Sequence, residues 1–81
     1  MKAHGWRNRS TQVAKGGSWC PDLVLVELDG ETRTDIQINL PDSVKLCATP
    51  EAAKCEAGRL AIWAAEELGW NIQYGLIEVA N

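Results

Sequence analysis

The sequence predicts one small α+β domain over residues 1–81, in which a three- to four-stranded, mainly antiparallel sheet carries one long helix on one face (β-β-β-α-β). Two β-rich segments flank the turn dipeptide Asp29-Gly30, and an alanine-rich segment runs from Pro50 to Gly69. The 81 residues are 46% hydrophobic and 23% charged, the composition of a globular domain with a single core. This length excludes a two-domain enzyme, and no apolar run is long enough to predict a membrane span.

The first expected element is an edge strand over residues 6–13. This segment is mostly polar, with weak alternation of apolar and polar residues. Arg7 and Arg9 on such a strand would discourage pairing with further strands. The glycines at 16 and 17 then mark a turn before the apolar run that follows.

Residues 22–28 and 32–40 are expected to form a β-hairpin. Asp-Gly between β-rich segments favours a two-residue type I′ turn, whose central residues both have positive φ. With Asp29-Gly30 as that turn, Leu28 pairs with Glu31 and Leu25 with Thr34. One face of the hairpin then carries Leu23, Leu25, Thr34, Ile36 and Ile38, and the other carries the aliphatic row Val24, Val26 and Leu28. Because one helix covers only one face, this row is expected at the surface or against a partner.

The helix is expected from Pro50 to Leu68. Thr49 is a capping residue, Pro50 suits the first helical position, and Gly69 suits the position just past the end. Helical periodicity predicts a buried stripe of mostly small residues, namely Ala53, Ala57, Leu60, Ala61, Ala64 and Leu68. Ile62 and part of Trp63 remain outside this stripe. Residues 71–79 alternate up to Gly75 and change phase after it, which predicts a final strand with a bulge.

Charge is divided unevenly along the chain. Residues 1–20 carry four basic residues and no acid (+4), whereas residues 21–81 carry four basic and eleven acidic residues (−7). The basic segment contains Trp6, Arg7, Arg9 and Lys15, a mixture of charge and stacking surface that single-stranded nucleic-acid binders use. The pI of about 5.0 opposes binding of a polyanion. Nucleic-acid binding is therefore the alternative function.

The sequence predicts no metal site, no cofactor and no catalysis. Cys20, Cys47 and Cys55 are an odd number without a Cys-x-x-Cys pair, which favours free thiols in a reducing compartment. With His4 they make four zinc ligands, but zinc sites usually draw ligands in close pairs. His4 is the single histidine and lies in a segment expected to fray, so no nucleophile and base pair is expected. Without a secretory signal, the expected location is the cytoplasm, or the host cytoplasm if a phage encodes the chain.

Residues 22–68 resemble the small domains of HicB-type antitoxins and related bacterial and phage proteins. The resemblance is carried by Leu40-Pro41 after a third strand, by the helix opening Thr49-Pro50-Glu51, and by Ala61-Ile62-Trp63 within the helix. Asp42-Ser43 and Cys47-Ala48 depart from the family pattern, and the appended DNA-binding domain has no counterpart. The resemblance implies a protein-binding domain of this shape without autoregulatory DNA binding. Phage-encoded inhibitors, including anti-CRISPR proteins, share this size and architecture.

The predicted function is a non-catalytic protein-interaction module, a small inhibitor or antitoxin-like protein. Surplus apolar surface and separated charge suit oriented docking to a basic partner. The predicted protein-binding residues are Val24, Val26 and Leu28 on the sheet, and Glu56, Ile62, Trp63, Glu66 and Glu67 on the helix. The same apolar face would also suit a homodimer.

Overall fold

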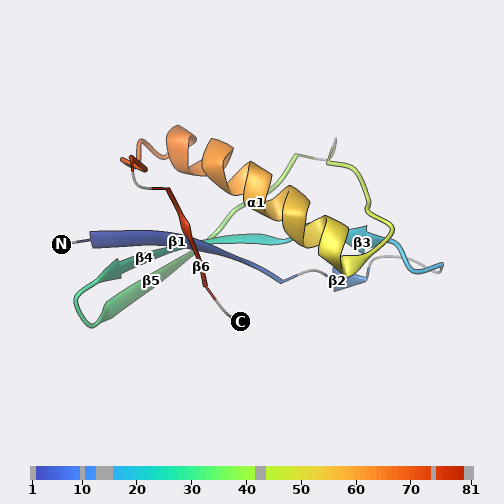
Figure 1. The fold of residues 1–81 in the computed structure, drawn as a ribbon, viewed down its shortest axis with the longest axis horizontal. Helices are drawn as coiled ribbons and strands as arrows, with labels where there is room; N and C mark the ends of the chain where they lie inside the picture. Colours follow the sequence, from blue (N-terminus) through green and yellow to red (C-terminus); the bar gives the residue numbers. More distant parts are fainter. Residues whose placement is uncertain (1, 10, 13–15, 42–43, 74, 80–81) are drawn as a thin grey trace.

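The computed structural model describes residues 2–9, 11–12, 16–41, 44–73 and 75–79. Helix α1 (Pro50–Glu67) lies across one face of a four-stranded sheet (Figure 1). The strand order in this sheet is β5 (Thr32–Gln37), β4 (Leu23–Asp29), β1 (Lys2–Asn8) and β6 (Ile77–Glu78). A second, two-stranded sheet pairs β2 (Thr11–Gln12) with β3 (Trp19–Cys20). The predicted α+β class is confirmed.

Strand β1 lies inside the sheet, so the predicted edge strand over residues 6–13 is wrong. β1 pairs antiparallel with β4 along its whole length and parallel with β6 at Gly5 and Trp6. Gly5 permits the second pairing, because a Cβ there would lie 2.6 Å from the carbonyl oxygen of Ile77 and 2.8 Å from the Val79 side chain. The missing side chain of Gly5 thus lets β6 lie beside β1.

The predicted hairpin is confirmed, with a different turn. Asp29 pairs with Thr32, so the central turn residues are Gly30 and Glu31. Only Gly30 has positive φ (61°), the pattern of a type II′ turn, in which glycine takes the first central position. Leu25 consequently pairs with Ile36 instead of Thr34. The register differs from the predicted one by two residues, so each side chain keeps its predicted face.

The predicted helix is confirmed at both ends. Thr49 Oγ1 accepts a hydrogen bond from the Ala52 N–H at 3.1 Å, and Pro50 begins the helix. Leu68 caps the other end, and Gly69 follows with φ of 74°. Leu68 is 47% exposed, so its predicted burial is wrong. Leu68 is the cap residue, at which the chain leaves the helix, and the buried stripe of α1 ends before it.

The predicted long final strand is reduced to Ile77–Glu78. Gly75 has φ of 82°, which interrupts the extended backbone, and the segment then runs parallel to β1. The Val79 N–H donates to the Trp6 carbonyl at 2.8 Å and continues this contact. The sheet is therefore mixed, with antiparallel pairing everywhere except between β1 and β6.

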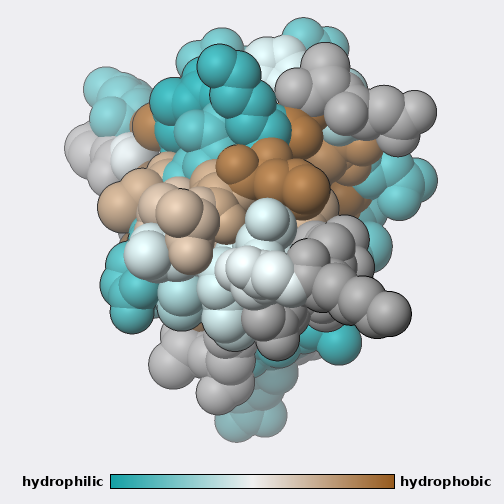
Figure 2. Space-filling view, turned by 90° about the vertical axis from the view of Figure 1, so that its right-hand side faces the viewer, coloured by the Kyte–Doolittle hydropathy of each residue, from teal (hydrophilic) through white to brown (hydrophobic). Residues whose placement is uncertain are grey.

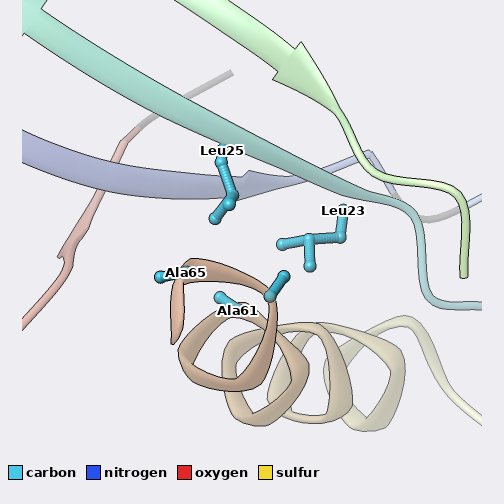
Figure 3. Packing of buried hydrophobic residues seen from close by; sticks show 5 residues of the cluster. Leu23, Leu25, Ala61 and Ala65 are labelled. Carbon is cyan, nitrogen blue, oxygen red and sulfur yellow. The ribbon is translucent and has the colours of Figure 1, made fainter. Parts of the chain in front are cut away.

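The core lies between β4 and α1. Leu23 and Leu25 point from β4 toward Ala61 and Ala65 of the helix (Figure 3). Both leucines and both alanines are fully buried, and the small alanines let the helix lie close to the sheet. Trp6, Trp70 and several half-buried aliphatic residues surround this cluster. The burial of the alanine stripe fixes which side of α1 faces solvent.

Candidate protein-binding surface

The side of α1 that faces away from the sheet exposes two large apolar residues. Ile62 is 50% exposed and Trp63 is 44% exposed, as the helical periodicity predicts. Glu66 and Glu67 lie one turn further along and are exposed. We call Ile62, Trp63, Glu66 and Glu67 the outer helix surface. Leu68 is also exposed, but the helical period aligns it with Ala61 and Ala64 on the sheet side, so it is not counted in this surface.

Ile62 and Trp63 lie on opposite sides of the line along α1 that points directly away from the sheet. Four residues before Ile62, Gly58 lies against the Trp6 indole, because a Cβ there would be 3.0 Å from Trp6 Cζ2. Ile62 therefore lies toward the β6 side. Leu60, three residues before Trp63, lines a pocket with Pro41, in the segment that follows β5. Trp63 therefore lies toward the β5 side of the helix.

The helix carries paired and unpaired charges. Glu56 pairs with Arg59, and the hydrogen bond from Arg59 holds the pKa of the Glu56 carboxyl below its usual range. Lys54 pairs with Glu78 of β6, and this hydrogen bond raises the pKa of the lysine. Within the described part of the chain, no ion pair involves Glu51, Glu66 or Glu67.

Glu66 and Glu67 are unfavourably placed for the helix itself. The C-terminal end of a helix carries partial negative charge, and cations stabilise it. α1 has no basic residue in its last turn. Two carboxylates at this end therefore weaken the helix, whereas a cationic group placed against them would relieve the repulsion.

The prediction that Val24, Val26 and Leu28 lie at the surface is wrong for Val24 and Val26. Val24 is 2% exposed and Val26 is fully buried, and only Leu28 is half-buried. On this face of the sheet, the ion pair between Arg7 and Asp35 crosses β4 (3.2 Å). The Val79 side chain lies at the Gly5 position, which is opposite Val26. The chain thus covers its own aliphatic row without a second helix.

Two of the candidate nucleic-acid residues, Trp6 and Arg7, do not share a surface. Trp6 faces the helix, whereas the adjacent Arg7 points to the other face of the sheet and pairs with Asp35. Arg9 follows β1, and its N–H donates to the Asp22 carbonyl at 2.9 Å. Lys15 lies outside the described residues. Adjacent residues of a strand point to opposite faces of the sheet, so Trp6 and Arg7 are separated although they are neighbours in the sequence.

A pocket of about 480 Å³ opens between β1, β6 and the first half of α1. It is lined by Trp6, Glu51, Lys54, Cys55, Gly58 and Glu78. The indole of Trp6 contributes its apolar wall, and the Lys54–Glu78 pair joins the helix to β6 at its rim.

His4 is held firmly, contrary to the expected fraying of its segment. Its ring stacks on Trp70 with centroids 4.4 Å apart, and its Nε2 lies 3.1 Å from Glu27 Oε2. Sequence reasoning missed this cluster because the three residues are far apart along the chain: the β1–β4 register brings His4 beside Glu27, and Trp70 comes from the segment after α1. Among the residues whose positions are described, no group of three or more His, Cys, Asp or Glu side chains is placed to hold a metal ion.

A second apolar region lies at the end of the molecule where α1 begins. Figure 2 shows this end, with hydrophobic surface bordered by hydrophilic residues. Leu46 is 53% exposed in the segment leading to Cys47, which bridges to Trp19.

No protein-family model, curated protein or solved structure matches this chain. Within the described ranges, no helix combines the length and the apolar character that a membrane crossing requires.

Proposed function

We propose that this chain is a non-catalytic protein-interaction module that docks onto a basic protein partner through the outer helix surface. In this proposal it acts as a small inhibitor or antitoxin-like protein of bacterial or phage origin, consistent with the HicB-like segment order. The observation that carries the proposal is the exposure of Ile62 and Trp63 beside Glu66 and Glu67, which make no ion pair among the described residues.

The two kinds of side chain would contribute differently to binding. Aromatic residues are enriched at the centre of protein interfaces, and Trp63 presents nearly half of its surface to solvent. Carboxylates at the rim mainly guide encounter and orientation. A partner with basic residues around an apolar recess would satisfy both, and it would also neutralise the negative end of the helix.

The test combines crosslinking in cells with binding of purified proteins. A photo-crosslinking amino acid at position 66 identifies the partner, which is then purified and titrated with the wild-type chain. Ile62→Asp and Trp63→Ala are expected to weaken binding at least tenfold. Leu46→Asp is the matched control, because Leu46 is 53% exposed and Ile62 is 50% exposed.

Inhibition is tested with the same proteins. If the partner is an enzyme or toxin, an equimolar amount of the wild-type chain is expected to suppress its activity, and Ile62→Asp is expected not to. Equal affinity of wild type, Ile62→Asp and Trp63→Ala for the purified partner would overturn the proposed surface. Binding without any effect on the partner's activity would overturn the inhibitor role alone.

A further inference from the structure

Strand β5 forms an open edge of the main sheet. It is the outermost strand in the order β5-β4-β1-β6, and among the described residues no strand pairs with its outer side. All its residues except Ile36 are exposed. Natural edge strands usually carry proline, unpaired charges or a bulge that discourages pairing with another chain. β5 has no proline, its ladder with β4 is continuous, and its two charged side chains, Arg33 and Asp35, are of opposite sign and pair with each other.

The backbone groups of alternate β5 residues point outward. The Ile38 N–H donates to the Leu23 carbonyl at 3.1 Å, which makes this a hydrogen-bonded pair of the hairpin. Hydrogen-bonded and non-hydrogen-bonded pairs alternate along an antiparallel ladder. Thr32, Thr34 and Ile36 therefore direct their N–H and C=O groups toward β4. Arg33, Asp35 and Gln37 direct theirs away from the sheet.

We propose that two copies of this chain join edge to edge through β5, in an antiparallel ladder with its two-fold axis at Thr34. In this register Arg33 of each copy lies opposite Asp35 of the other. These are the residues whose backbone groups point outward, so each such pair exchanges two hydrogen bonds. Opposite charges directly across a ladder stabilise it, and the central Thr34 pair brings together two β-branched side chains.

The charges favour this register over its two neighbours. In a two-fold antiparallel ladder that uses the outward backbone groups, a shift in one direction pairs Arg33 with Arg33. A shift in the other direction pairs Asp35 with Asp35. Like charges directly opposite each other destabilise a ladder. The spacing of one cation and one anion two residues apart is therefore self-complementary, which is the property that an isologous interface needs.

The proposed dimer is compatible with the remainder of the fold. Helix α1 packs mainly against β1 and β4, which leaves β5 free at the side of the sheet. The two-fold axis runs perpendicular to the joined sheet, so both helices lie on the same face. The outer helix surfaces of the two copies then point in one direction. This proposal does not depend on the proposed function. It involves the β5 edge and a second copy of the chain, whereas the proposed function involves the outer helix surface and a different protein.

The first test measures mass in solution and exchanges the two charges. Wild type is expected to sediment at twice the 8.9 kDa mass of the chain, at high micromolar concentration. Arg33→Asp and Asp35→Arg each place like charges across the ladder and are expected to sediment as monomers. An equimolar mixture of these two variants restores opposite charges at every position and is expected to form a heterodimer. Arg59→Asp and Glu51→Arg carry the same charge changes elsewhere and are expected to remain dimeric.

A second test leaves the charges unchanged. Thr34→Cys, in a chain whose three natural cysteines are replaced by serine, places two thiols across the two-fold axis and is expected to form a disulfide dimer on mild oxidation. Thr32→Cys is the control, because position 32 lies opposite Ile36 of the other copy and its thiols are too far apart.

Three outcomes would overturn the proposal. Wild type that remains monomeric up to millimolar concentration would do so. A wild-type dimer that persists in both single charge variants would place the interface elsewhere. Equal crosslinking of the two cysteine variants would show that the contact is not centred on Thr34.

Discussion

The guanidinium of Arg7 reaches over strand β4 to the carboxylate of Asp35, with Nη2 3.2 Å from Oδ2. In the two ladders Arg7 lies opposite Val24, and Asp35 lies opposite Val26. The arginine stem and the ion pair thus cover the valine row on the face of the sheet away from the helix. Long basic side chains often cover apolar surface in this way while their charged ends stay near water.

Arg7→Ala is expected to lower the free energy of unfolding by about 1 kcal/mol, because it removes both the ion pair and the cover of the valines. Arg33→Ala is the matched control, since it removes a second cation from Asp35 without exposing Val24 or Val26. Urea unfolding followed by far-UV circular dichroism, at a dilution where both are monomeric, measures the difference. Equal losses in the two variants would show that the arginine stem contributes nothing.

Stability is expected to fall in acid partly through Asp35. The hydrogen bond from Arg33, aided by the charges of Arg33 and Arg7, holds the pKa of Asp35 below its usual range. In the unfolded chain this carboxyl takes up its proton near pH 3.9, so below about pH 4 the unfolded state binds more protons than the fold. The contribution of Asp35 is thus present above that pH and is lost as pH falls through the folded pKa. Urea titrations at a series of pH values should show a shallower acid slope for Asp35→Asn than for wild type.

His4→Ala is expected to destabilise the fold by about 1 to 2 kcal/mol, since it removes the stack on Trp70 and the hydrogen bond to Glu27. Lys2→Ala is the control at the same carboxylate, because Lys2 Nζ is 3.7 Å from Glu27 and its side chain is 56% exposed. Chemical denaturation gives both values, and the near-UV signal of the tryptophans reports the lost stack. A near-UV spectrum that stays unchanged in His4→Ala would contradict the stacked arrangement.

Gly5→Ala is expected to cost about 2 kcal/mol or more and to detach β6. The new methyl group would meet the backbone carbonyl of Ile77 at 2.6 Å, which a side-chain movement cannot relieve. Hydrogen exchange of the Val79 amide, which donates to Trp6, should lose its protection. Gly58→Ala is the comparison, because its new methyl group would meet the Trp6 indole at 3.0 Å while alanine favours the helix. A smaller loss in Gly58→Ala is the expected contrast.

The double substitution Glu66→Lys/Glu67→Lys is expected to separate stability from binding. Cations at the negative end of α1 should raise the free energy of unfolding by about 0.5 kcal/mol each. The same change should weaken binding to a basic partner at least tenfold, mainly by slowing association. Thermal unfolding measures the change in stability, and association kinetics with the partner immobilised on a surface measure the change in binding. Association that is as fast as in wild type would show that these carboxylates do not guide docking.

Much of the candidate site could be predicted on the helix, and little of it on the sheet. The outward position of Ile62 and Trp63 follows from a period of 3.6 residues and a stripe of alanines, both of which are visible in the sequence. The sequence predicts that Val24 and Val26 are exposed only because a single helix covers one face of a sheet. A long arginine from the next strand and the Val79 side chain cover that face instead, and neither has a local sequence pattern.

The sequence by itself determined the elements that depend on neighbouring residues. Thr49 and Pro50 begin the helix, Gly69 follows its end, and Gly30 closes the hairpin, because caps and turns depend on the conformational preferences of a few adjacent residues. Only the tertiary structure decided that β1 lies between β4 and β6. Backbone hydrogen bonds between strands are alike for nearly all residues, so the partner of a strand is selected by packing between distant segments. Here the missing side chain of Gly5 allows β6 to approach, and Arg7 finds its carboxylate two strands away.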